Sequence, residues 1–310
     1  MTLTAAVNAL KANDNYLLIT HTNPDGDTLG SAAALCSALR RAGKKAVLFP
    51  NVEVSDKFSP YVSDYFGDNS EYDFVISVDT AAENMFCKGF SGHVDLCFDH
   101  HPSNSGYADN SVVRDDYSSC GELIYELIKK LNGEITKEEA DLLYIAVSTD
   151  TGCFQYYNAN QHTFETAEKL IKAGAKNGYL NQVFFRKTSL SRLKLESMIL
   201  DSLSFHVNDK VCVALVTLDM LKKSAAVERD LDDIASIAGR AEGCSVSITI
   251  REKDVNCCKV SVRSGTEVDS SKICSYFGGG GHKMAAGCTV YASPEKTRDM
   301  ILSVAQEVMR

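Results

Sequence analysis

Residues 94–101 read VDLCFDHH, a mostly apolar run that leads directly into one carboxylate and two imidazoles. A short apolar run bounded by polar residues is typical of a buried strand. In an open parallel sheet, ligands bind outside the carboxyl ends of the strands, where the residues that follow each strand collect. We therefore predict that Asp99, His100 and His101 lie at such an edge, beside side chains delivered by other strands.

Three further clusters of acidic residues or histidine follow apolar runs in the first half of the chain. They are His21, Asp25 and Asp27 after residues 16–20, Asp79 after residues 74–78, and Asp150 after residues 142–149. We expect three of the four clusters to be placed at one crevice by the carboxyl ends of their strands, and Asp150 to join them there. Each motif alone would more often be a turn, a cap or a loop, so the prediction rests on the joint pattern.

The charge that would gather at this edge requires cations. Five carboxylates and three imidazoles would meet there, and carboxylates this close repel one another. Oxygen and imidazole ligands without thiolate suit Mn²⁺ or a similar divalent ion better than structural zinc. Eight ligands are too many for one ion. The pattern predicts two ions about 3.5–4 Å apart that share a carboxylate, clamp a phosphoryl group and lower the pKa of an attacking water.

The segment 24–28, PDGDT, has local features that suit such a site. Pro24 restricts the entry of the chain, and Gly26 permits a tight turn. Because Asp25 and Asp27 are two residues apart, we expect them to face different ions. Thr28 is predicted to cap a helix over residues 28–42, whose positive end favours anions.

A second motif, YFGGGGHKMAAG, spans residues 276–287. Successive glycines let backbone amides approach an anion closely, and the motif lacks the spacing of a Walker A loop. Arg263, beside Ser264 after the run 259–262, could present a guanidinium fork to phosphate. Helix-forming residues follow the glycines, which argues against the alternative of a flexible linker. The residues expected to bind substrate are Arg263, Ser264, Gly279, Gly280, Gly281, His282 and Lys283.

Composition narrows the class of protein. The 310 residues carry a net charge of −9, which argues against a long footprint on duplex DNA. Residues 1–185 hold 25 acidic and 14 basic side chains, a balance of −11, and residues 186–310 hold 16 and 18, a balance of +2. No apolar run approaches the roughly 20 residues of a membrane span, and the start does not resemble a signal peptide. The 11 cysteines form no CxxC pair, so we expect reduced thiols in the cytoplasm.

The alternation of strands and helices predicts an α/β fold with two domains. Residues 1–188 are expected to form a parallel sheet covered on both faces, with helices at 28–42, 121–131, 138–147 and 161–173. A linker helix is expected within 189–205. Residues 206–310 are expected to form a smaller α/β domain, with strands at 211–218, 246–251, 259–263 and 288–291 and helices at 230–238, 269–277 and 294–308.

These motifs resemble a known family. The set His21, Asp25-Gly-Asp27, Asp79, Asp99-His100-His101 and Asp150 resembles the motifs of the DHH phosphoesterase superfamily, and residues 262–282 resemble the DHHA1 substrate-binding domain. The resemblance covers nearly the whole chain. Its length is similar to that of the short nanoRNase type, oligoribonucleases that also hydrolyse 3′-phosphoadenosine 5′-phosphate (pAp). The sequence SSCGE at 118–122 departs mildly from the family pattern, so what this helix start contacts is left open.

The resemblance implies a role for each residue of the site. One metal would be held by His21, Asp25 and Asp79, and the other by Asp27, Asp79, His100 and Asp150, with Asp79 as the bridge. His101 would face the scissile phosphate, and Asp99 would orient a neighbouring histidine. The glycine loop, Arg263, His282 and Lys283 would grip the terminal phosphate and sugar of the substrate. The metals implied are two Mn²⁺, with Mg²⁺ or Co²⁺ as substitutes.

We expect hydrolysis of very short 5′-phosphorylated oligoribonucleotides (nanoRNA) to nucleoside 5′-monophosphates, with pAp phosphatase activity at the same site. One alternative is a phosphodiesterase for linear or cyclic dinucleotides such as pApA and cyclic di-AMP. Another, from a different class, is a nucleotide-binding regulator without turnover. Residues 93, 162 and 206 are expected to be surface or loop histidines. The apolar stripe of 189–203 is expected to pack on the chain's own domains, with a homodimer as the alternative.

Overall fold

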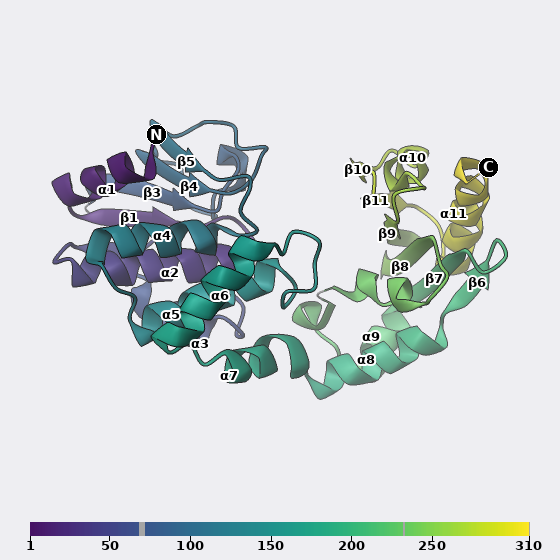
Figure 1. Cartoon of the computed structure of the whole chain (residues 1–310). Coiled ribbons are helices and arrows are strands. Elements are labelled where there is room, and N and C mark those ends of the chain that lie inside the picture. Colours follow the sequence, from purple (N-terminus) through teal and green to yellow (C-terminus); the bar gives the residue numbers. More distant parts are fainter. Residues whose placement is uncertain (68–71, 232, 310) are drawn as a thin grey trace. The chain divides into compact units, whose positions relative to one another are not determined.

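Two sheets organise the chain in the computed structural model, which describes residues 1–67, 72–231 and 233–309 (Figure 1). The chain divides into one unit of Met1–Lys187 and a second of Thr188–Arg310. Helix α8 (Leu190–Asp201), which covers most of the expected linker, belongs to the second unit. Among the described residues, no helix is both long enough and apolar enough to cross a membrane.

The first unit is built on a parallel sheet of five strands in the order β2-β1-β3-β4-β5. The strands are β1 (Tyr16–Ile19), β2 (Ala46–Leu48), β3 (Phe74–Val78), β4 (Leu96–Asp99) and β5 (Asn110–Val113). The strand order changes direction between β1 and β3, which creates a topological switch point at the carboxyl ends of these strands. Strand β5 was not predicted, because it is a short and half-exposed edge strand without a continuous apolar run.

Both faces of this sheet are covered, as the continuous apolar runs predict. Leu18, Ile76 and Phe98 lie in the larger core with the apolar sides of the helices. On the other face, Leu17 and Val75 pack against residues of the loops around the short 3₁₀ helix Glu83–Met85. The core helices are α1 (Leu3–Ala12), α2 (Gly26–Arg41), α4 (Cys120–Asn132) and α5 (Lys137–Asp150), and further helices are α3 (Ser59–Val62), α6 (Gln161–Ala173) and α7 (Asn177–Asn181).

Two local predictions for this unit were wrong. Asp150 is the last residue of helix α5 and does not follow a strand, because residues 142–149 continue the helix that a capping box of Thr136 and Glu139 begins. Helix α2 begins two residues earlier than expected. Asp25, not Thr28, is its N-cap, and its carboxylate accepts hydrogen bonds from the backbone N–H groups of Asp27 and Thr28.

The second unit contains a mixed sheet of six strands in the order β10-β11-β9-β8-β7-β6, in which only β7 and β8 are parallel neighbours. The strands are β6 (Ser204–His206), β7 (Val211–Val216), β8 (Val246–Asp254), β9 (Cys257–Ser264), β10 (Gly280–His282) and β11 (Ala285–Val290). Helices α10 (Ser270–Ser275) and α11 (Pro294–Val308) share one core with the sheet. Helices α8 and α9 (Leu218–Ser224) cover the other face.

Three predictions for this unit were wrong. The helix expected at 230–238 is replaced by 3₁₀ turns at Glu228–Leu231, Ile234–Ser236 and Ala238–Arg240, and Asp233 has a φ of 54°, which no helix interior accepts. Position 232 lies outside the described residues. The strand expected at 211–218 stops at Val216, because Thr217 caps α9. The helix-forming residues cited against a flexible linker after the glycine run belong to strand β11, which includes most of the strand predicted at 288–291.

Candidate metal centre

The carboxyl ends of β1, β3 and β4 bring most of the predicted ligands together. His21 lies two residues after β1, Asp79 follows β3 directly, and Asp99 is the last residue of β4. These three strands are neighbours in the sheet. Asp79 has a φ of 55°, an uncommon conformation for a residue other than glycine, so the extended backbone of β3 ends at this residue. The topology therefore collects the histidines and acids at the switch point of the sheet.

Two helices supply the remaining acids. Asp25 and Asp27 stand at the start of α2, and Asp150 stands at the end of α5, which packs against α2. Gly26 permits this approach, because a Cβ atom at that position would lie 2.3 Å from Oγ1 of Thr149. The absence of a side chain on Gly26 thus lets the carboxylates of the two helices converge.

A first candidate cluster consists of His21, Asp25 and Asp79. His21 Nε2 lies 3.6 Å from Asp25 Oδ1 and 3.7 Å from Asp79 Oδ2. Its Nδ1 is 2.8 Å from the carbonyl oxygen of Thr22, so Nδ1 carries the proton and donates it. In the neutral ring Nε2 then has a free lone pair that faces both carboxylates, as in metal-binding histidines.

A second candidate cluster consists of Asp27, His100 and Asp150. His100 Nε2 lies 3.7 Å from Asp27 Oδ2 and 3.6 Å from Asp150 Oδ2. Its Nδ1 donates to the carbonyl oxygen of Tyr117 at 3.2 Å, so Nε2 again faces the acids. The two histidines therefore have the same arrangement on opposite sides of Asp79.

Asp79 connects the two clusters. Its Oδ2 faces His21, while its Oδ1 lies 3.4 Å from His100 Nε2 and 3.6 Å from His101 Nδ1. The residue is 2% exposed, and Oδ1 has no hydrogen-bond partner among the described residues. A buried carboxylate oxygen without a partner is costly unless a cation satisfies it. The donor set of oxygens and imidazoles fits divalent cations of the Mn²⁺ or Mg²⁺ type.

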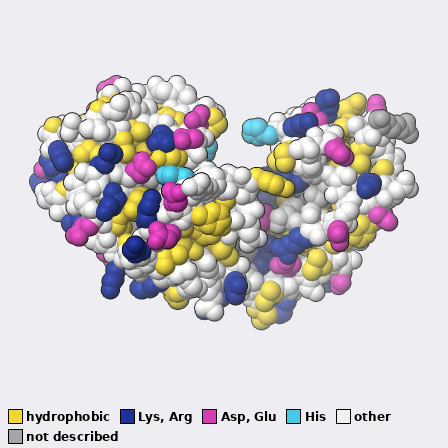
Figure 2. Space-filling model, viewed as in Figure 1, with side chains coloured by type: hydrophobic (Ala, Val, Ile, Leu, Met, Phe, Trp, Pro, Cys, Tyr) yellow, Lys and Arg dark blue, Asp and Glu magenta, His cyan; other side chains and the backbone are white. Residues whose placement is uncertain are grey.

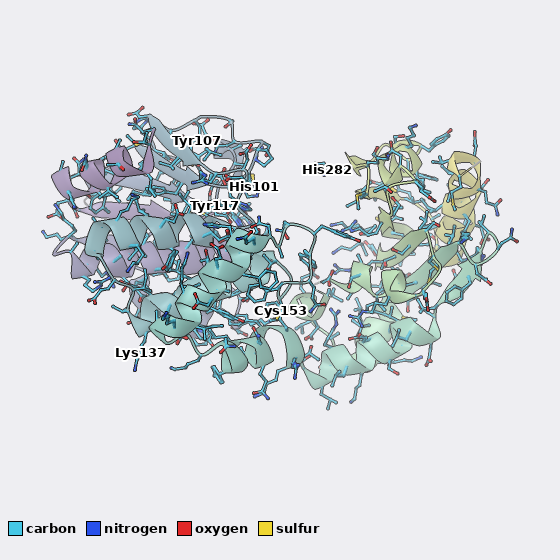
Figure 3. The ribbon with its side chains drawn as sticks, viewed as in Figure 1. His101, Tyr107, Tyr117, Lys137, Cys153 and His282 are labelled. Atoms are coloured by element: carbon cyan, nitrogen blue, oxygen red, sulfur yellow. The ribbon has the colours of Figure 1, made fainter. Side chains whose placement is uncertain are left out.

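Asp99 has different contacts from the other acids. It is fully buried, and its Oδ1 accepts hydrogen bonds from the backbone N–H of His100 at 2.8 Å and from Nδ1 of His101 at 2.8 Å. Its Oδ2 accepts a bond from Asn104 at 2.6 Å. These bonds hold the ring of His101, which is labelled in Figure 3 and has a side chain 38% exposed. Asp99 therefore orients His101 and does not face the clusters.

The pKa shifts show how strongly these groups interact. Burial, then repulsion from Asp79, Asp150 and Asp25, raises the pKa of Asp27 well above its usual range. Burial is also the largest cause that raises the pKa of Asp150 to about 7. Burial of His21 alone would lower its pKa, but hydrogen bonds to Asp25 and Asp79 raise it to about 10. These shifts indicate that burial and mutual repulsion make the acids of the site favour a bound positive charge.

The predicted substrate residues of the second unit lie at one end of its sheet. Ala285 of β11 pairs with Arg263 on one side and with His282 on the other, so these two exposed side chains share a face of the sheet. Gly279 lies against the backbone, where a Cβ atom would be 2.3 Å from the carbonyl oxygen of Gly287. Ser264 Oγ is bonded to Val268 and Ser270 within the unit.

The glycine run has a structure that the sequence did not predict. Gly280 and Gly281 lie with His282 in strand β10, where an anion-binding loop was expected, and Lys283 follows exposed at the turn to β11. A cavity of about 540 Å³ adjoins the run and is lined by Lys259, Phe277, Gly278, Gly279, Gly280, Gly287, Cys288, Thr289 and Tyr291. In the view of Figure 2, basic side chains are scattered among acidic ones and form no continuous stripe.

The sequence missed several groups that hold the ligands. The backbone N–H groups of Cys120 and Gly121 donate to the carboxylate of Asp27, at 2.6 and 2.9 Å. Backbone groups carry no signal of residue type, so no motif could have indicated them. His162 was expected at the surface or in a loop, but it lies in helix α6, where its side chain is 29% exposed and donates to the buried carboxylate of Glu122. His93 is exposed beside Asp109, and His206 bonds to Ser204.

Comparison with known proteins adds independent information. Residues 15–147 match the model of the DHH family, N-terminal domain, and residues 208–310 match the model of the DHHA1 domain. The chain is 30% identical to the bifunctional oligoribonuclease and PAP phosphatase NrnA of Thermus thermophilus over 290 residues, which cover 91% of this chain and 86% of that protein. The protein of the same name from Bacillus subtilis is 27% identical and covers 95% of both chains.

A solved structure shares the fold of the whole chain. The crystal structure of an exopolyphosphatase-related protein from Bacteroides fragilis superimposes with a TM-score of 0.86. The match covers 98% of this chain and 95% of that chain, at 21% sequence identity. At this identity the likeness concerns the fold of the two units.

Proposed function

The chain belongs to the DHH/DHHA1 phosphoesterase family and is a hydrolase of phosphoester bonds, and on this basis we propose that it cleaves very short 5′-phosphorylated oligoribonucleotides to nucleoside 5′-monophosphates and hydrolyses pAp at the same site. The observation that carries the proposal is the buried carboxylate of Asp79, which lies between two histidines with its Oδ1 unpartnered in the described part of the chain. The relatives from Thermus thermophilus and Bacillus subtilis are named for both activities, oligoribonuclease and PAP phosphatase.

We assign the metal ligands to two sets that share Asp79. His21 and Asp25 would complete one set, and Asp27, His100 and Asp150 would complete the other. Oxygen and imidazole donors without thiolate favour Mn²⁺. Two such cations, when bound, would neutralise the charge of a phosphoryl group and lower the pKa of the attacking water.

His101 is assigned the position that faces the substrate. Its Nδ1 is tied to Asp99, so the ring is held in one orientation and its Nε2 remains for the scissile phosphate or the leaving group. As a cation or general acid at that point, His101 would stabilise the negative charge that develops on departing oxygen. Asp99 contributes by fixing the tautomer and the angle of this ring.

The second unit is assigned the terminal phosphate and sugar of the substrate. Arg263 and His282 share one exposed face, and Lys283 follows at its edge, so three donors suited to a phosphate lie at one end of the sheet. The adjoining cavity offers Phe277 and Tyr291 beside Lys259, which suits a nucleoside. A site of this size favours one or a few nucleotides over a long strand.

A comparison of substrates tests the proposal. Rates of the Mn²⁺-loaded protein on pAp, pApA, a five-nucleotide RNA and cyclic di-AMP would be measured side by side, with Asp79→Ala as the control for contaminating nucleases. We expect the short linear RNA and pAp to be hydrolysed, and Asp79→Ala to be inactive on both. A strong preference for cyclic di-AMP would replace the proposal by the cyclic-dinucleotide alternative.

The alternative of a non-catalytic regulator makes a different prediction. Such a protein would bind nucleotides but gain no activity from added Mn²⁺ on any of these substrates. The complete ligand set argues for turnover.

We also propose a cytoplasmic location, which the eleven unpaired cysteines of the described chain support, because thiols stay reduced there.

A further inference from the structure

A buried acid lies behind the candidate metal centre and has no part in the ligand sets. Glu122 is fully buried in the first turn of α4. Its Oε1 accepts hydrogen bonds from Ser118 Oγ and, at 3.1 Å, from Thr163 Oγ1, while its Oε2 accepts one from His162 Nδ1. Ser118 and Thr163 are buried as well. A carboxylate removed from water in this way is stable only because it is fully hydrogen-bonded.

The same turn of chain contacts two candidate ligands directly and is linked to a third through one side chain. We call residues 117–122 the 117–122 turn. The N–H groups of Cys120 and Gly121 donate to the two carboxylate oxygens of Asp27, at 2.6 and 2.9 Å. The carbonyl oxygen of Tyr117 accepts the hydrogen bond of His100 Nδ1. Asp27 and His100 therefore take their orientation from backbone groups of this turn.

The third contact passes through a side chain. Nδ2 of Asn158 donates to the carbonyl oxygens of Ser118 and Asp150, at 3.2 and 3.1 Å. This amide links the turn to the end of α5, where Asp150 presents its carboxylate to His100. All three residues of the second candidate cluster thus depend on the 117–122 turn, directly or through one amide.

His162 holds the turn from outside. Its ring stacks on Tyr117, with ring centroids 4.2 Å apart and planes 20° apart, and its Nε2 lies 3.4 Å from Oε1 of Glu126. His162 and Thr163 both lie in the first turn of α6, so this helix is connected to α4 through Glu122. The 117–122 turn is therefore fixed at both ends, by the stacked ring and by the buried acid.

We propose that Glu122 and His162 are positioning residues of the metal centre, which hold Asp27, His100 and Asp150 in place through the 117–122 turn. The inference rests on the proposed metal-dependent function and deepens it. Loss of the groups that hydrogen-bond metal ligands typically changes metal affinity 10- to 100-fold. In this turn those groups are backbone N–H and carbonyl groups, which Glu122 and His162 hold in place. A purely structural role for this pair would change the stability of the fold without changing the affinity of the folded protein for metal.

Four variants separate these roles. Glu122→Gln keeps the volume but loses an acceptor, and His162→Ala removes both the ring and the donor. His162→Asn places an amide nitrogen near the position of Nδ1 and is the conservative variant. His206→Gln is the matched control, because His206 lies in β6 of the second unit, belongs to no candidate metal cluster among the described residues, and bonds to Ser204 Oγ at 2.9 Å. Mn²⁺ dissociation constants would be measured by isothermal titration calorimetry on chelator-treated protein, with circular dichroism to verify the fold.

We expect the Mn²⁺ dissociation constant to rise about tenfold or more in Glu122→Gln and His162→Ala, to recover in His162→Asn, and to stay unchanged in His206→Gln. At saturating Mn²⁺ the turnover rates should return toward that of the wild type. Folded Glu122→Gln and His162→Ala proteins with wild-type Mn²⁺ affinity would overturn the inference and leave the proposed function intact. A wild-type protein that binds no Mn²⁺ would instead contradict the proposed function, and this inference with it.

Discussion

Asp79 and His100 face each other across 3.4 Å from the ends of two neighbouring strands, with Oδ1 of the carboxylate directed at Nε2 of the ring. His100 commits its other nitrogen to the carbonyl oxygen of Tyr117. Asp79 Oδ1 has no hydrogen-bond partner in the described residues. Asp79 Oδ1 and His100 Nε2 are therefore both free to bind a metal ion in the space between them. This relationship underlies the metal-dependent mechanism that we propose.

The pair of Asp99 and His101 predicts a loss of turnover without a loss of metal. His101→Gln should lower kcat by about 10²–10⁴-fold, because it removes the donor that we assign to the substrate phosphate. Asp99→Asn should lower kcat too, since His101 loses its charged hydrogen-bond partner. Mn²⁺ affinity of His101→Gln, measured by calorimetry, should match that of the wild type. A large drop in that affinity would mean that His101 is a metal ligand.

The contact of α2 with α5 predicts sensitivity at Gly26. Gly26→Ala would place a methyl group 2.3 Å from Thr149 Oγ1 and force the helices apart. We expect unfolding in urea to show a loss of about 1–3 kcal/mol, as for overpacking in other cores, together with weaker Mn²⁺ binding. Gly178→Ala is the control, because a Cβ atom there meets no atom within 4 Å. Equal stability of both variants would contradict the close approach.

The acids of the site predict how pH affects the stability of the metal-free protein. The pKa of Asp150 is raised from an ordinary 3.8 to about 7, so the folded state holds this proton more tightly than the unfolded state does. The stabilisation of the folded state by this proton is fully present below about pH 4 and is lost as the pH rises toward 7. The pKa of His21 is raised to about 10, so the folded state loses further stability as the pH rises from about 6.5 to 10.

Melting temperatures of chelator-treated protein should therefore fall between pH 5 and 8, and saturating Mn²⁺ should remove most of this decline. Asp150→Asn should flatten the profile of the metal-free protein in the lower part of this range, because the amide does not titrate. A metal-free protein that gains stability across pH 5 to 8 would show that burial and repulsion do not raise the pKa of Asp150 as described.

The exposed face that carries Arg263 and His282 in the second unit predicts variants that weaken substrate binding without affecting metal binding. Arg263→Ala should raise KM about 10- to 100-fold, the value of a lost charged hydrogen bond to phosphate, and leave Mn²⁺ affinity unchanged. His282→Ala should act in the same direction, since both side chains share one face. Lys253→Ala, at an exposed position of β8, is the control for lost surface charge. Unchanged KM in Arg263→Ala would place the terminal phosphate elsewhere.

Most of the fold and the residues brought to the centre could be predicted from the sequence, because apolar runs and the residues that follow them determine the edge of a parallel sheet. Asp150 shows the limit of this reasoning. The run before it is apolar enough for a strand, and composition does not separate a buried strand from a buried helix. The stretch 230–238 has apolar residues at helical spacing, yet Asp233 adopts a left-handed conformation that divides it.

The supports of the site could not be predicted in the same way. Cys120 and Gly121 act through backbone N–H groups, and Tyr117 acts through a carbonyl oxygen, so their residue types carry no signal. His162 meets Glu122 across 40 positions of sequence, which only the packing of α6 against α4 brings together. Such contacts depend on tertiary structure, whereas His21, Asp79 and His100 are placed by the ends of the strands that they follow.

Electron paramagnetic resonance of chelator-treated protein titrated with Mn²⁺ tests the central claim most directly. The account predicts two Mn²⁺ per chain with a spin-coupled signal, because the carboxylate of Asp79 faces both clusters and would bridge ions about 3.5–4 Å apart. Asp79→Asn should abolish the coupled signal in a protein that remains folded. Two uncoupled ions in the wild type, or a coupled pair that persists in Asp79→Asn, would contradict it.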